Sequence, residues 1–215
     1  ALNEEIDFIL KNAGKYMSVK PKRDDIKSVF AGLRPLAATS NKQSTKEVSR
    51  SHKIDISPSG LISVLGGKWT TYRKIAEDAL NTAISINKLK KKKCKTERTK
   101  LFGFKRNVSW SDPMHVYGSM KKKVESLGGI NDNKSLSKKF YISNNIIEWS
   151  IIHEMALTVE DILARRTRCV FLDSKESKRI SPVVAQKMAD VLGEDDKWID
   201  AELKKFNKLI KNYIV

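Results

Sequence analysis

The sequence lacks the patterns that mark several classes of protein. It has no uninterrupted run of eighteen apolar residues, so no membrane-spanning helix is predicted. Its only two cysteines, Cys94 and Cys169, are far apart and show no CxxC or Cys/His ligand spacing, which argues against a disulfide framework and against a zinc site. Both are therefore predicted to be free thiols in a reducing compartment. The three histidines show no mutual metal-ligand spacing, so no metal site is expected.

The sequence also lacks an initiator Met and the charged and apolar regions of a signal peptide. We therefore expect the chain to be part of a longer protein. With 215 residues, 40% of them hydrophobic and 31% charged, it has the composition of a globular protein rather than of a disordered or fibrous one. Its 42 basic residues exceed its 25 acidic ones by 17, which favours acidic partners such as nucleic acid, phosphorylated metabolites or anionic lipid.

The first part of the chain is predicted to mix short helices with β-structure. Helical spacing of apolar residues predicts a helix over residues 2–15, and a β-prone stretch over residues 26–36 predicts a strand followed by a loop. Two alternating runs, 54–56 and 61–65, flank a Ser-Pro-Ser-Gly turn and predict a β-hairpin. A glycine turn and a helix through residues 75–84 follow directly.

The rest of the chain is predicted to be helical after a basic linker. Ten basic residues and one acid lie between Lys88 and Arg106. Beyond them, Asp112-Pro113, Thr158 to Asp161 and Ser181-Pro182 have the character of helix starts, and Gly193 of a helix stop. We therefore predict an α+β chain with three parts: an incomplete, β-rich domain (1–87), a basic linker (88–104) and an all-α C-terminal domain (105–215).

The strongest local candidate for a binding site is the turn from Gly66 to Thr70. Two glycines allow the backbone to approach a ligand closely, while the start of a helix and Lys68 place positive charge beside it. The spacing is not that of a phosphate-binding P-loop, and no glycine pair has the GxG spacing of a dinucleotide fingerprint. A tight strand-to-helix turn without a ligand is an equally good interpretation of these residues alone.

Arg34 is the second candidate, because it lies in an apolar stretch between Gly32 and Pro35. Its guanidinium suits a carboxylate or a phosphate. A structural salt bridge and a substrate anion are equally good partners on this pattern alone.

Five segments of the sequence share their order and spacing with one known family: Arg23 to Ile26, Ala31 to Leu36, Ser49 to His52, Leu61 to Glu77 and Glu154 to Arg168. Together they resemble the C-terminal portion of the FAD-dependent glycerol-3-phosphate dehydrogenase family. Residues 86–145 match this family only loosely.

The resemblance implies roles for the two candidate sites. It places Gly66, Gly67, Lys68, Trp69 and Thr70 against the pyrimidine side of the flavin, and it places Arg34 and Lys68 at the substrate, as catalytic residues. It further implies oxidation of glycerol 3-phosphate to dihydroxyacetone phosphate, with hydride transfer to FAD and electrons passed to quinone. The division of roles between Arg34 and Lys68 stays open.

The family's glycine-rich ADP-binding segment is missing from this sequence. We therefore expect the isolated chain neither to retain FAD nor to be active. By the same resemblance, the parent protein is expected to be cytoplasmic and peripherally membrane-associated, or attached to the mitochondrial inner membrane. Contact of the lysine-rich linker with an anionic membrane and a homodimer are further expectations.

The composition of the chain is also compatible with two other functions. A basic nucleic-acid-binding module is favoured by the net charge, but the lysines gather in one linker and no nucleic-acid-binding signature is present, so no nucleic-acid partner is predicted. A helical cap with a purely structural or dimerising role is compatible with the enzyme interpretation. His52 has either a role in the site or a structural one. Arg165 and Arg166 are expected to pair with acids between helices or with the flavin domain rather than to bind substrate.

Overall fold

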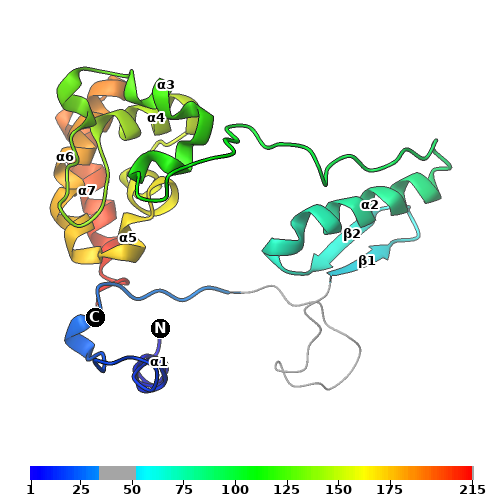
Figure 1. Cartoon of the computed structure of the whole chain (residues 1–215), viewed down its shortest axis with the longest axis horizontal. Helices are drawn as coiled ribbons and strands as arrows, with labels where there is room; N and C mark the ends of the chain where they lie inside the picture. Colours follow the sequence, from blue (N-terminus) through cyan, green and yellow to red (C-terminus); the bar gives the residue numbers. More distant parts are fainter. Residues whose placement is uncertain (34–51, 215) are drawn as a thin grey trace. The chain divides into compact units, whose positions relative to one another are not determined.

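The computed structural model describes residues 1–33 and 52–214, and the chain divides into two units (Figure 1). The helical unit comprises residues 1–31 and 103–215, and the hairpin unit comprises residues 32–102. One unit is made of helices and the other carries an antiparallel sheet, which confirms the predicted α+β class. Arg34 and the predicted loop 38–51 lie outside the described residues.

The core of the helical unit lies where α4, α6 and α7 pack together with the π-helical segment η5. Ile147, Leu163, Val184 and Phe206 are among its fully or almost fully buried side chains. The elements of this unit are α1 (Asn3–Ala13), η1 (Arg23–Asp25), η3 (Pro113–Met120), α3 (Lys121–Glu125), η4 (Ile130–Asn133), α4 (Asn144–Glu154), η5 (Asp161–Arg166), α5 (Cys169–Leu172), α6 (Ser174–Leu192) and α7 (Asp196–Ile210).

Helix α6 runs through Ser181-Pro182, so the predicted helix start at these residues is wrong. The helix begins earlier, at Ser174, because the Asp173 carboxylate caps it by accepting a hydrogen bond from the Glu176 N–H at 2.9 Å. Pro182 has no N–H to donate to the carbonyl four residues before it, that of Lys178. The buried Ser181 hydroxyl donates to that carbonyl at 2.9 Å instead, which lets the helix continue.

The strand predicted from residue 26 is also wrong for the residues that are described. Residues 26–33 form neither helix nor strand, and they pack on the helical unit. The Val29 N–H donates to the Tyr213 carbonyl at 2.9 Å, and the Ser174 N–H donates to the Lys27 carbonyl at 3.0 Å. Residues 1–31 therefore belong to the helical unit, which differs from the predicted domain over 1–87.

The hairpin unit confirms the predicted hairpin and the order of strand, glycine turn and helix. Strands β1 (His52–Ile56) and β2 (Ile62–Gly66) are antiparallel, and His52 faces Gly66 across the pair. The short helix η2 (Trp69–Thr71) and helix α2 (Tyr72–Ile86) follow. None of the described residues of this unit is buried, so its apolar side chains are not enclosed within the unit.

No helix within residues 1–33 and 52–214 has both the length and the apolar character that crossing a membrane requires.

Candidate functional site

A hollow of about 820 Å³ lies in the hairpin unit between the turn after β2 and helix α2. We call it the glycine-turn hollow. All five residues predicted to bind the cofactor line it. Its complete lining is Leu33, Val64, Gly66, Gly67, Lys68, Trp69, Thr70, Tyr72, Ile75, Ala76 and Ala79.

Two consecutive glycines shape the turn that forms one side of this hollow. Gly66 and Gly67 have φ angles of 70° and 91°, which L-residues with a side chain rarely adopt. A Cβ atom on Gly67 would lie 2.7 Å from Cδ1 of Ile75 and 3.2 Å from Cβ of His52. The close approach of the turn to α2 and β1 therefore requires glycine at position 67.

Lys68 and the start of the helical segment supply positive charge at the hollow. The Lys68 carbonyl accepts hydrogen bonds from the Thr71 N–H at 3.0 Å and from the Thr71 hydroxyl at 2.9 Å, which fixes the first turn. The N–H groups of a first helical turn have no partner within the helix and carry partial positive charge. The Lys68 side chain is exposed and forms no ion pair with residues 1–33 or 52–214. The arrangement therefore suits an anionic or electron-rich ligand.

Exposed aromatic rings form another side of the hollow. Trp69 is 88% exposed and Tyr72 is 52% exposed, and their ring centroids lie 6.0 Å apart with an interplanar angle of 30°. Ile75, Ala76 and Ala79 continue this apolar surface along α2. A flat heteroaromatic ligand would cover side chains that are otherwise open to water.

Tyr72 and Leu33 were not predicted as lining residues of the site. The spacing of residues 72, 75, 76 and 79 by threes and fours was the available signal for Tyr72, because it places them on one face of α2. Leu33 adjoins the predicted Arg34, but no pattern in the sequence brings it to the glycine turn.

His52 links β1 to α2 and does not line the hollow. Its Nε2 atom lies 3.1 Å from Oδ2 of Asp78, and Oδ1 of Asp78 accepts a hydrogen bond from Lys74 at 2.8 Å. The hydrogen bond from the Lys74 ammonium holds the pKa of the Asp78 carboxyl below its ordinary range. Of the two roles considered for His52, the structure supports the structural one.

Arg34 lies outside the described residues, so its predicted place beside Lys68 at the substrate stays a prediction. Within the described ranges, no group of three or more His, Cys, Asp or Glu side chains could hold a metal ion. Cys94 and Cys169 are both free thiols.

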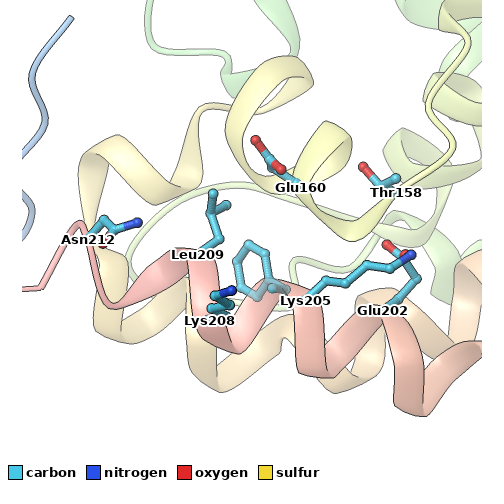
Figure 2. Close-up of a pocket in the computed structure, with 8 residues that line it drawn as sticks. Thr158, Glu160, Glu202, Lys205, Lys208, Leu209 and Asn212 are labelled. Atoms are coloured by element: carbon cyan, nitrogen blue, oxygen red, sulfur yellow. The ribbon is translucent and has the colours of Figure 1, made fainter.

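A second hollow, of about 330 Å³, lies in the helical unit between α7 and the start of η5 (Figure 2). Its acidic groups already have partners in the protein. Glu202 is buried. Its carboxylate accepts hydrogen bonds from the Val159 N–H at 3.3 Å and from Lys205 at 2.7 Å. Glu160 pairs with Arg165 at 2.6 Å. The bond from Val159 to Glu202 joins α7 to the residues just before η5, and the other two contacts pair the acids within their own segments, so we attribute a structural role to this hollow.

Arg165 and Arg166 both pair with acids, as expected. Arg165 pairs with Asp161 at 2.8 Å as well as with Glu160. Arg166 donates to the Glu154 carbonyl and lies 3.9 Å from its carboxylate. Among the described residues, the glycine-turn hollow is therefore the better candidate for a ligand site.

The glycine turn and α2 lie within the part of the chain that matches a known family. A family model described as the C-terminal domain of alpha-glycerophosphate oxidase matches residues 62–199, which include the turn, α2 and most of the helical unit.

Curated proteins resemble the chain over nearly its whole length. The mitochondrial glycerol-3-phosphate dehydrogenase of Bos taurus is 31% identical over 233 residues, covering 96% of this chain and 32% of that protein. The Homo sapiens protein of the same name is 30% identical with the same coverage. The mitochondrial glycerol-3-phosphate dehydrogenase of Arabidopsis thaliana is 28% identical over 249 residues, covering 98% of this chain and 38% of that protein. The chain thus spans about a third of the length of these relatives.

Proposed function

Because the chain belongs to the family of the C-terminal domain of alpha-glycerophosphate oxidase, we propose that it is the C-terminal part of a flavoenzyme that oxidises glycerol 3-phosphate to dihydroxyacetone phosphate. The glycine-turn hollow carries this proposal. It is an open concave surface that combines close backbone approach, aromatic rings and an unpaired ammonium group within the described residues.

The lining residues fit the flavin ring of FAD. Gly66 and Gly67 bring the backbone to the edge of the hollow, where a Cβ on Gly67 would overlap Ile75. Trp69 and Tyr72 offer flat apolar surface for an aromatic ring system. When bound, FAD would supply the hydride acceptor that the side chains of this protein do not provide.

In this proposal, Lys68 and the first N–H groups of the helical segment stabilise negative charge at the pyrimidine side of the cofactor. Arg34 and Lys68 face the substrate, where they bind the phosphate or polarise the hydroxyl that is oxidised. Both roles follow from the resemblance and from the position of Lys68 at the hollow.

The proposal also includes the partners of the full-length protein, a quinone and a membrane. Electrons pass to quinone, and the protein contacts an anionic membrane. The names of the relatives support a mitochondrial location. Attachment to the inner membrane follows from the resemblance alone. The quinone acceptor and a homodimer stay predictions.

The first test uses the chain by itself. We expect the purified 215-residue chain to bind no FAD and to leave glycerol 3-phosphate unoxidised, because its sequence contains no glycine-rich fingerprint for the adenine and pyrophosphate. Absorbance spectra after incubation with FAD and gel filtration would show a colourless protein. A yellow protein with a flavin band would contradict this expectation.

The second test uses the full-length enzyme. Lys68→Met is expected to lower kcat by about 100-fold to 1,000-fold, the effect of removing a group that stabilises charge in the transition state. Lys53→Met is the matched control, because Lys53 is an exposed lysine of the same unit that pairs with Asp55 outside the hollow. Steady-state rates with glycerol 3-phosphate, together with flavin content, would separate lost chemistry from lost cofactor. Equal rates in both variants would remove Lys68 from the mechanism.

A further inference from the structure

Residues 88–102 form a strongly basic segment that the proposed chemistry does not use. We call it the basic tract. It contains seven lysines, one arginine and a single acid, Glu97. The structure gives it no helix or strand, and every residue in it except Cys94 is exposed.

The basic tract is attached to the start of α2 through Arg73. This guanidinium lies 3.8 Å from the Glu97 carboxylate and donates a hydrogen bond to the Thr96 hydroxyl at 3.3 Å. Figure 1 shows the chain turning back after the end of α2, in agreement with these contacts. The only acid of the tract thus contacts Arg73, and no ion pair joins it to the lysines at positions 88 and 90–93.

The lysines at positions 88 and 90–93 form no ion pair with any part of the chain that the structure describes. Four of them are consecutive in the sequence, and all are exposed. Like charges held this close together on an exposed segment favour the binding of a surface with many negative charges.

Exposed apolar side chains accompany these charges. Leu89 is 58% exposed, and Leu101 and Phe102 are 71% and 90% exposed. Large apolar groups next to a lysine cluster are typical of segments that lie at a lipid interface, where the rings and chains enter the boundary below the headgroups.

We propose that the basic tract binds the surface of an anionic membrane, with its lysines at the lipid phosphates and Leu101 and Phe102 inserted between the headgroups. The inference rests on the membrane contact in the proposed function, and to the lysine-rich linker expected there it adds the unpaired state of five lysines among the described residues and the insertion of Leu101 and Phe102. It does not depend on flavin or on glycerol 3-phosphate.

Nucleic acid is the other polyanion that such a segment could meet. The composition of the tract favours lipid, because lysines outnumber arginine by seven to one and arginine is the residue preferred in nucleic-acid recognition. The tract also presents no helix or strand that could enter a groove.

The test measures binding of the whole chain to vesicles by co-sedimentation. The vesicles are phosphatidylcholine alone and phosphatidylcholine with about one-third phosphatidylserine. We expect binding only to the second kind, weakened by added salt. Replacing residues 90–93 by Gln is expected to weaken binding about 100-fold or more, and L101S/F102S about tenfold.

The matched control replaces four exposed lysines of the helical unit that form no ion pair among the described residues, Lys175, Lys178, Lys197 and Lys204, by Gln. It changes the net charge of the chain by the same amount, from +17 to 17 − 4 = +13. We expect it to bind like the unaltered chain, because the tract is intact.

Three results would overturn the inference. The first is binding to neither kind of vesicle. The second is an equal loss of binding in the tract variant and the control, which would indicate a general effect of net charge. The third is tight binding of duplex DNA at physiological salt, unchanged in L101S/F102S, without binding to vesicles. None of these results bears on oxidation of glycerol 3-phosphate, so the proposed enzymatic activity succeeds or fails separately.

Discussion

Gly67 has a positive φ angle and is packed tightly against Ile75 and His52. Gly67→Ala should destabilise the hairpin unit by about 2–4 kcal/mol, because the methyl group would lie 2.7 Å from Cδ1 of Ile75 and the backbone would be strained. Gly60→Ala is the control, since Gly60 has a φ of 84° but no atom within 4 Å of the added Cβ, and about 1–2 kcal/mol is expected.

Hydrogen exchange of the β2 and α2 amides in the whole chain measures the difference between these two variants. The double variant G67A/I75V should recover part of the loss, because valine lacks the Cδ1 atom that the methyl group would meet. Equal exchange in the two single variants would show that packing around Gly67 is loose.

Glu176 gives the helical unit a defined pH dependence. Its carboxylate accepts hydrogen bonds from Arg179 at 2.7 and 2.8 Å and from the Ser137 hydroxyl at 2.6 Å, and these bonds lower its pKa to about 2. Because the pKa in the folded protein lies below the ordinary value of 4.5, the carboxylate stabilises the fold above that pH. This contribution should be lost as the pH falls from 4.5 towards 2.

Urea unfolding at several pH values would test this dependence. Glu176→Gln should be less stable than the unaltered chain at pH 7 and should flatten the decline below pH 4.5. Glu194→Gln, at an exposed residue outside the ion pairs of the described structure, should leave the decline unchanged. An undiminished decline in Glu176→Gln would contradict the assignment.

Among the elements, α6 shows how a helix continues through a proline. Ser181→Ala should cost about 1 kcal/mol, because the Lys178 carbonyl loses the hydroxyl that replaces the missing N–H of Pro182. In a Pro182→Ala background the same change should cost less, since the alanine introduced there can donate its own N–H. Denaturant unfolding of the four proteins of this double-mutant cycle measures the coupling, and strictly additive effects would rule it out.

Local elements were predictable where local chemistry determines them. The hairpin follows from two alternating runs around Ser57 to Gly60, and α1 follows from its apolar spacing; both are confirmed. The start of α6 was predicted wrongly, because Pro182 is usual in a first helical turn and the hydroxyl that rescues the carbonyl cannot be recognised from spacing.

At the scale of the whole molecule, Phe30 connects residues 1–31 to the C-terminal part of the helical unit, residues 103–215. Its ring lies 4.9 Å from that of Phe171, edge to face, and Phe171 lies 5.7 Å from Tyr213. Phe30→Ala should destabilise the helical unit by about 0.5–1.5 kcal/mol. Phe8→Ala is the control, because Phe8 is similarly exposed and stacks on no ring among the described residues. Equal unfolding midpoints in denaturant would contradict the role of Phe30.

The sequence by itself determined the glycine turn, the lysine beside it and the family of the chain. These depend on residue type and spacing along one short segment, where backbone freedom and charge are local properties. Only the tertiary structure decided that Ile75 and His52 lie against Gly67 and that Tyr72 and Leu33 line its hollow. It also decided that Lys27 and Val29 bond to Ser174 and Tyr213. Such contacts join residues that are distant in the sequence. Many other residues of the chain could make the same hydrogen bonds or cover the same apolar side chains, so residue type and spacing do not say which pairs form.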